Sequence, residues 1–157
     1  LAAHEHGAAQ LNVALDGNTL ELALESPSMN IVGFEHAANS ASDRAAAAKA
    51  EQHLQDPLVL FNIAPNADCK VVSVVLASPL FSSATSSAPH TDEHSAEHSD
   101  VDASYSLTCG HAEQLRNIDL TELFKRFPAT QKIQAQLIGP NGQQGAELSP
   151  AKPSLSF

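Results

Sequence analysis

Three histidines at four-residue spacing lie in an acidic segment that contains no lysine or arginine. His90, His94 and His98 recur at i, i+4 and i+8, and this spacing places imidazoles on one face of a helical turn. Neutral imidazole is a ligand for Zn²⁺, Cu²⁺ or Ni²⁺, and a carboxylate can complete a four-coordinate zinc site. The candidate carboxylates of this segment are Asp92, Glu97 and Asp100. The pattern predicts a transition-metal site; the alternative is a solvated acidic loop.

A second group of candidate ligands lies nearer the amino end of the chain. His4 and His6 are one residue apart, so they share a face if the segment is extended. Glu35 and His36 follow the first predicted hairpin, and together the four residues favour a more ordered metal site. The alternative is a frayed polar terminus and a surface His36. Two histidines stand alone and are expected to have surface or structural roles: His53 and His111.

Catalytic chemistry finds less support in the sequence. Residues 94–98 formally match H-x-x-E-H, the signature of inverted zinc peptidases. That motif requires a rigid helix, a third protein ligand and a substrate cleft, whereas here it lies in a serine-rich stretch. No G-x-S-x-G and no glycine-rich phosphate loop is present. We expect a non-enzymatic protein, with a zinc-dependent enzyme or accessory domain, or a structural module with incidental histidines, as alternatives.

The composition of the whole chain also favours cations as ligands. Its 157 residues include 18 acids, 8 lysines and arginines and 8 histidines, which gives a formal net charge of -10. Nucleic acids and anionic membrane surfaces attract clustered basic residues, so neither is an expected partner. Membrane insertion is not expected either, because no run of about 18 apolar residues occurs.

The cysteines and the first residue indicate an exported protein. Cys69 and Cys109 do not form a C-x-x-C pair, and an even count of two fits a single structural disulfide formed in an oxidising compartment. The alternative is two separate buried thiols. The chain begins at Leu1 instead of Met. We therefore expect a periplasmic protein whose signal peptide has been removed; a shortened chain is the other explanation.

A β-hairpin is the first element that the sequence predicts. Large apolar residues alternate with polar or small ones over residues 11–15 and 20–24, around the turn residues Asp16, Gly17 and Asn18. Pro27 ends the second strand, because proline donates no hydrogen bond to a sheet. Residues 30–41 are transitional, with a bend at Gly33.

The next segments predict one main helix and a set of further strands. The helix spans residues 42–55, is capped by Ser40 or Ser42, and lies close to a sheet through its alanines. Residues 70–78 are dominated by valine, which predicts a central strand covered on both faces. The other elements are a helical turn over 57–61, a strand over 102–109, a short helix over 119–127, a hairpin of 132–139 and 143–149, and a terminal strand over 154–157.

Together these elements predict an α+β fold. We expect a single domain over residues 1–157, with a mostly antiparallel sheet, one main helix and short helical turns. Residues 79–101 are rich in serine, histidine and acids, with almost nothing apolar after Phe81. Such a stretch buries too little surface to offset its chain entropy. We therefore expect a long flexible loop that carries the first predicted metal site.

Two motif blocks carry a family resemblance. Residues 4–13 read HEHGAAQLNV and residues 25–36 read ESPSMNIVGFEH. With both cysteines, the histidine-rich loop and the segments near residues 60, 124 and 142, they resemble the ZrgA-type zinc-regulated periplasmic proteins of Gram-negative bacteria over most of the chain. The loop of that family carries longer runs of alternating histidine and aspartate than this chain does.

The resemblance implies a protein that binds zinc in the periplasm and assists its uptake alongside an ABC-type zinc importer. It makes His4, His6 and His36 stronger candidates than their spacing alone. Zn²⁺ is then the expected metal, with Cu²⁺ and Ni²⁺ as alternatives. The expected function is the capture of Zn²⁺ and its delivery towards a zinc import system.

Overall fold

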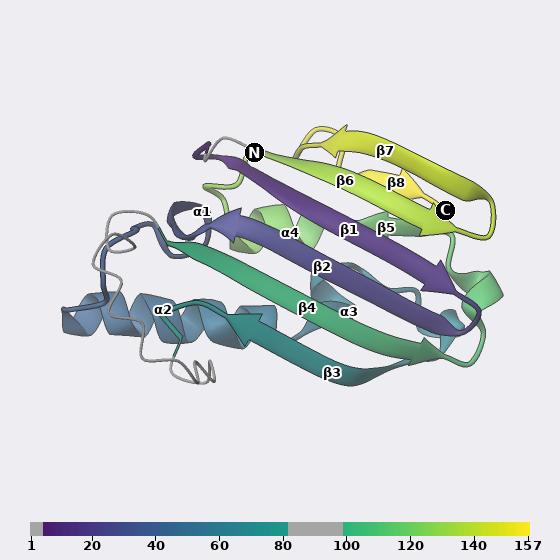
Figure 1. Ribbon diagram of the computed structural model, residues 1–157, viewed down its shortest axis with the longest axis horizontal. Coiled ribbons are helices and arrows are strands. Elements are labelled where there is room, and N and C mark those ends of the chain that lie inside the picture. The colour runs from purple at the N-terminus through teal and green to yellow at the C-terminus, as the bar shows by residue number, and fades with distance from the viewer. Residues whose placement is uncertain (1–4, 82–98) are drawn as a thin grey trace.

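The computed structural model describes residues 5–81 and 99–157, in which six strands form one sheet in the order β3-β4-β2-β1-β6-β7 (Figure 1). Neighbouring strands are antiparallel except β1 and β6, which are parallel. The strands are β1 (Ala8–Asp16), β2 (Thr19–Pro27), β3 (Cys69–Ala77), β4 (Asp100–Cys109), β6 (Lys132–Gly139) and β7 (Gly142–Leu148). A separate ribbon pairs β5 (Asn117–Asp119) with β8 (Ser154–Ser156).

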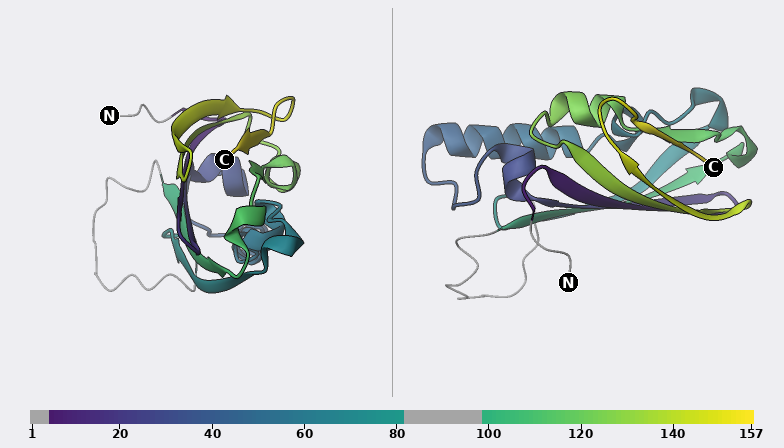
Figure 2. Two further views of the ribbon diagram at one scale, coloured as in Figure 1. Left: turned by 90° about the vertical axis from the view of Figure 1, so that its right-hand side faces the viewer. Right: turned by 90° about the horizontal axis from the view of Figure 1, so that it is seen from above.

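Helices and the β5–β8 ribbon cover one face of this sheet (Figure 2). The helices are α1 (Ser28–Val32), α2 (Ala41–Leu54), α3 (Pro57–Leu60) and α4 (Thr121–Arg126), with 3₁₀ turns at Pro65–Ala67 and Ala112–Gln114. This arrangement confirms the predicted α+β fold, with a mostly antiparallel sheet and one main helix.

Strand alternation sends one set of side chains into the core beneath the helices. In the first hairpin the leucines and valine at residues 11, 13, 15, 20, 22 and 24 are all buried, as the alternation predicts. The two-residue turn is Gly17-Asn18, where Gly17 has a φ of 59° that glycine adopts without strain. The same alternation places polar and small side chains on the opposite face.

The main helix begins and packs as its sequence predicts. The Ser40 hydroxyl accepts a hydrogen bond from the Asp43 N–H at 3.0 Å, which caps α2. The buried residues of α2 are Ala47, Ala50 and Leu54. At its end, the Tyr105 hydroxyl of β4 donates to the Leu54 carbonyl at 2.6 Å and fastens the helix to the sheet.

The prediction that the valine-rich strand lies at the centre of the sheet, covered on both faces, is wrong. β3 lies at the edge of the sheet instead of its centre, and Val72 and Val75 are 64% and 60% exposed. Valine suits an edge strand as well as a buried one, because its β-branched side chain fits any pleated surface. Which strands flank it depends on pairing with residues far along the chain. An irregularity between Val71 and Ser73 interrupts the ladder to β4, as bulges often do at sheet edges.

The predicted disulfide is confirmed. Cys69 begins β3 and Cys109 ends β4; the two residues are direct cross-strand partners and their sulfurs are bonded. The bond closes a chain segment of 40 residues. It holds the end of the β3–β4 hairpin that lies away from the connecting loop.

Two segments depart from the predicted boundaries. Residues 30–32, expected to be transitional, belong to the helix α1 (Ser28–Val32), and Gly33 makes the predicted bend with a φ of 89°. At the other segment, the predicted loop over 79–101 gives way to strand from Asp100 onwards. The preceding Ser99 is buried.

Candidate metal centre

Three of the segments that carry predicted ligands meet at one end of the sheet (Figure 1). β1 begins at this end, β2 ends there and β4 begins there. His6 precedes β1, Glu35 follows β2 through α1, and Asp100 is the first residue of β4, paired with Pro27. The strand order therefore gathers residues that are up to about ninety positions apart in the chain.

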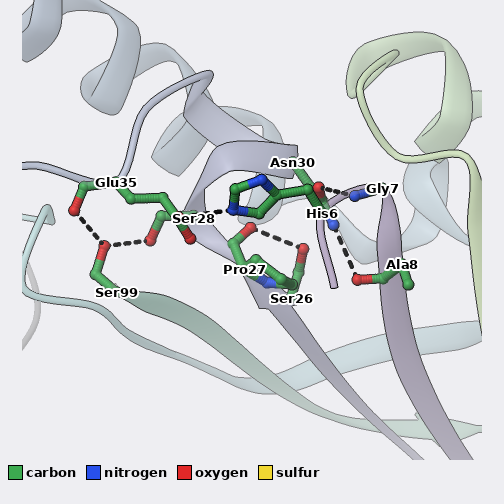
Figure 3. A network of polar contacts seen from close by, with 9 residues as sticks. All are labelled: His6, Gly7, Ala8, Ser26, Pro27, Ser28, Asn30, Glu35 and Ser99. Carbon is green, nitrogen blue, oxygen red and sulfur yellow. Dashed lines mark hydrogen bonds and ion pairs between the residues drawn. The ribbon is translucent and has the colours of Figure 1, made fainter. Parts of the chain in front are cut away.

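His6 and Glu35 form the centre of this region. The His6 Nε2 lies 2.7 Å from the Glu35 Oε1 (Figure 3). The Glu35 side chain is 7% exposed and the His6 side chain 53%. Among residues 5–81 and 99–157, Glu35 is the only buried residue with an ionisable side chain other than Tyr105 and the disulfide cysteine. A buried carboxylate requires partners. Because the His6 imidazole reaches solvent, a metal ion can bind to it and to the Glu35 carboxylate together.

The backbone that follows His6 is held from two sides. The buried Asn30 side chain accepts a hydrogen bond from the Gly7 N–H at 2.7 Å and donates one to the Ala8 carbonyl at 2.9 Å. The Gly7 carbonyl accepts from the backbone N–H groups of Gln131 and Lys132 at 2.7 and 3.0 Å. Gly7 has a φ of 88°, a conformation that favours glycine. The glycine of the HEHG block therefore turns the chain so that His6 is positioned beside α1.

The backbone of Glu35 is tied to the start of β4. Gly33 ends α1 and donates to the Met29 carbonyl at 3.1 Å, which turns the chain back towards His6. The Ser99 hydroxyl donates to the Ser28 hydroxyl at 2.7 Å and lies 3.4 Å from the Glu35 carbonyl (Figure 3). The Ser28 N–H in turn donates to the Ser99 carbonyl at 2.9 Å. Ser99, the residue next to His98 in the sequence, thus joins α1 and Glu35.

Buried polar groups concentrate at this end of the molecule. In the described part of the chain, the buried polar or charged residues outside the core are Ser26, Ser28, Asn30, Glu35, Ser78, Ser99 and Thr130. All but Ser78 belong to the network around His6 and Glu35 or bond to it. Sequence reasoning missed the roles of Ser28, Asn30 and Ser99. The available signal was the position of the first two inside a motif block, between apolar residues that the core requires.

His36 lies beside Glu35 in sequence but has its own partners. Its ring stacks on Phe34 with centroids 4.7 Å apart, and its Nδ1 lies 2.8 Å from the Ala37 carbonyl and 3.8 Å from the Asp43 carboxylate. A carbonyl oxygen only accepts, so the Nδ1 carries the proton in this contact. The Nε2 lone pair of His36 is then available to a cation, which is the arrangement common to histidines that bind metals.

Carboxylates extend the candidate centre along the sheet. Asp102 and Glu25 are direct cross-strand partners on β4 and β2. Burial raises the pKa of Asp102, and the negative charges of Glu25 and Asp100 raise it further. A carboxyl group whose pKa is raised by neighbouring negative charges lies in a region that attracts cations.

The structure brings His6 and Glu35 into contact; of the other predicted ligands that it describes, Asp100 begins β4 at the same end of the sheet and His36 has its own partners. Within residues 5–81 and 99–157, no group of three or more histidine, cysteine or acidic residues is arranged to hold a metal ion. The predicted ligands that lie outside the described residues are His4, His90, Asp92, His94, Glu97 and His98. Of the isolated histidines, His53 packs edge-on against Phe127, and the exposed His111 lies 3.5 Å from Glu113.

Comparison with known proteins identifies the family. No helix in the described part of the chain is long and apolar enough to cross a membrane. No curated protein matches the sequence. A family model described as "ZrgA family zinc uptake protein" matches residues 3–157, which include the His6–Glu35 pair, both cysteines and the histidine-rich segment. The chain therefore belongs to the ZrgA family of zinc uptake proteins.

Proposed function

We propose that this protein captures Zn²⁺ in the periplasm and assists its delivery to a zinc import system. The family supports a role in zinc uptake. The disulfide supports an oxidising compartment such as the periplasm. The observation that carries the proposal is the contact between His6 and Glu35, because it pairs a nitrogen and an oxygen ligand at a position that the surrounding backbone holds in place.

The first zinc site forms around His6 and Glu35. Their nearest atoms, the His6 Nε2 and the Glu35 Oε1, are 2.7 Å apart, which is hydrogen-bond distance. Two ligands bound to one tetrahedral Zn²⁺ at about 2.0–2.1 Å lie about 3.3 Å from each other, so a small outward movement of the two side chains admits the ion. His4 and His36 are the proposed further ligands. His4 is supported by its position beside His6 in sequence, and His36 by its Nε2 lone pair.

The second zinc site lies in the histidine-rich segment. Its proposed ligands are His90, His94 and His98 together with Asp92, Glu97 and Asp100. This segment rejoins the fold at Ser99, whose hydroxyl lies within hydrogen-bond distance of the Glu35 backbone. We expect weaker binding and faster release here than at the first site, because a loop site loses more chain entropy when it binds. Zinc collected by the loop then passes to the ordered site or to the importer's periplasmic component.

Zinc titration by calorimetry tests this function. The chain should bind Zn²⁺ more tightly than about 0.1 mM, and weaker binding than that would overturn the proposal. His6→Ala and Glu35→Gln should each weaken the tighter site at least about tenfold. His111→Ala is the matched control, because His111 is exposed and distant in sequence from the proposed ligands. Changing His90, His94 and His98 to alanine should remove the weaker site and leave the tighter one.

A transport assay tests the second half of the proposal. Zinc-starved cells that lack the protein should grow more slowly than cells that contain it. Export of the protein to the periplasm should restore growth, whereas the His6→Ala, Glu35→Gln double variant should not. Equal growth with the double variant would separate zinc uptake from this site. Competition with Cu²⁺ and Ni²⁺ in the same titrations measures the metal preference.

A further inference from the structure

The six-stranded sheet has one face that no helix or strand of the described residues covers (Figure 2). Six strands about 4.8 Å apart and about nine residues long give this face an area of about 700 Å². This area is close to the roughly 800 Å² that each partner contributes to a standard protein interface. We call this surface the open face.

Apolar and small side chains lie together on part of the open face. Val75 of β3 and Ile138 of β6 are 60% and 54% exposed. Between them lie small side chains in register: Val75 pairs with Ser104, which pairs with Ala23, and Ile138 pairs with Ala14. We call these five residues the apolar centre. They line a shallow hollow of about 400 Å³ together with other residues that include Asn12, Glu21 and Gln136.

One end of the same face is acidic. Asp102 and Glu25 are direct partners on β4 and β2, and Glu147 of β7 lies in the same row across the sheet. Lys132 is the base at this end, with its Nζ 4.0 Å from Glu147 and 3.2 Å from Glu5. A second hollow of about 420 Å³ contains Glu25, Asp100 and Glu147. We call Glu25, Asp102 and Glu147 the acidic end; it lies two residues, or about 7 Å, along the strands from the apolar centre.

Like charges directly opposite each other destabilise a sheet. The pairing of Glu25 with Asp102 therefore costs stability unless a cation comes to lie between or beside the two carboxylates. An exposed apolar patch rimmed by charge is typical of a binding surface. The two features share one face, so a single ligand that is both basic and apolar satisfies both.

We propose that the open face docks a protein partner that presents lysine or arginine beside apolar side chains. The apolar groups occupy the apolar centre and the basic groups contact the acidic end. Charge decides against the other occupants. A second copy carries the same net charge of -10, and residues 82–98 of the chain itself contain Asp92, Glu93 and Glu97 but no lysine or arginine. Either of these would bring negative charge onto carboxylates.

The test uses the full chain, ¹⁵N-labelled and kept metal-free with EDTA, so that its outcome is independent of zinc binding. The probe is a short peptide of alternating lysine and leucine. A lysine–serine peptide of equal charge and a glutamate–leucine peptide of equal apolar content are the controls. The lysine–leucine peptide should shift amide resonances of β1, β2, β4 and β6, and it should bind at least about fivefold more tightly than either control. Shifts centred on α2–α4, or equal binding of the three peptides, would overturn the proposal.

Two pairs of substitutions separate charge from apolar contact. Glu25→Gln with Asp102→Asn should weaken lysine–leucine binding about five- to tenfold. Asp56→Asn with Glu113→Gln removes the same charge from exposed residues outside the open face and should leave binding unchanged. Val75→Thr with Ile138→Thr keeps β-branched residues in the strands and should weaken binding by loss of the apolar contact. Each variant is first checked for an unchanged amide spectrum outside the substituted strands.

Two further outcomes concern the rejected occupants. Sedimentation of the metal-free chain should show a monomer at concentrations used for the titration. If the chain instead forms a dimer, and the dimer dissociates when Val75→Thr and Ile138→Thr are introduced, the open face would be assigned to a second copy. Peptide binding that occurs only after residues 82–98 are replaced by a glycine–serine linker would assign it to the chain's own segment. Either result contradicts the proposed partner.

Discussion

The two ends of the β3–β4 hairpin are built on opposite principles. At one end, Cys69 and Cys109 join the strands covalently, and the Cys109 N–H donates to the Asn18 carbonyl at 2.8 Å. At the other end, β4 follows the buried Ser99, whose hydroxyl bonds to the Ser28 hydroxyl and lies near the backbone carbonyl of the buried Glu35. The first end is held by a bond that leaves no polar side chain to satisfy, whereas the second depends on every polar group finding its partner.

The comparison shows how a small domain can carry a polar centre. Buried polar groups stabilise little when satisfied and cost about 1–3 kcal/mol each when they lose a partner. A disulfide that closes 40 residues contributes roughly 3–4 kcal/mol by limiting the unfolded chain. We infer that the covalent end supplies stability that the polar end, whose groups are satisfied but stabilise little, does not. Four predictions test this division, from the largest expected effect to the smallest.

Replacement of both Cys69 and Cys109 by alanine should lower the free energy of unfolding by roughly 3–4 kcal/mol and the melting temperature by about 10 °C. Zinc affinity, measured at a temperature where the variant stays folded, should change little, because the proposed zinc ligands lie at the opposite end of the hairpin. Thermal melts and calorimetry measure the two quantities. A large loss of zinc affinity in the folded variant would show that the two ends are not separate.

Zinc binding should weaken steeply as the pH falls below about 6, because protons compete with the metal for imidazole. With two imidazoles among the ligands, affinity should fall up to about a hundredfold per pH unit. Titrations at several pH values measure this slope. In the His6→Ala variant the slope should become shallower, and an unchanged slope would remove His6 from the ligand set.

Asn30→Ala should destabilise the polar end and weaken zinc binding there. The change leaves the buried Gly7 N–H and Ala8 carbonyl without this partner, at a cost of about 2 kcal/mol. Because the backbone after His6 then moves more, zinc affinity should fall as well. Asn66→Ala is the matched control, since Asn66 makes an exposed bond to Gln114. Equal effects of the two substitutions, measured by denaturant titration and calorimetry, would contradict the assigned role of Asn30.

Asp102→Asn should have the smallest effect and the opposite sign. The folded protein raises the pKa of Asp102 above its ordinary 3.8, so the native state binds this proton more tightly than the unfolded chain does. The contribution of Asp102 to stability is therefore complete below about pH 3.8 and is lost as the pH rises through the raised pKa. At pH 7 and without metal, the asparagine variant should melt at a slightly higher temperature. The difference should disappear in acid, and Glu113→Gln, at an exposed residue, should show none.

Local sequence patterns predicted the elements whose cause is local. Alternation over residues 11–24 predicted the first hairpin, and Ser40 and Pro57 mark the starts of α2 and α3 as expected. α1 was missed because five residues between a proline and a glycine produce no helical period to detect. The valines of β3 predicted a strand at the centre of the sheet, but β3 lies at its edge. Valine content cannot distinguish the two positions, because valine fits both.

The candidate centre also has some features that the sequence predicts and others that only the fold determines. The sequence by itself determined which residue types are present: histidines in two blocks, an acidic chain and a pair of cysteines. Only the tertiary structure decided that His6 meets Glu35 and that Ser99 joins α1 to the Glu35 backbone. It also decided that acidic and apolar side chains share one open face. The physical reason is that a side chain's type and its neighbours along the chain can be read directly from the sequence. Contact across 29 or 64 positions depends instead on the order in which strands pair.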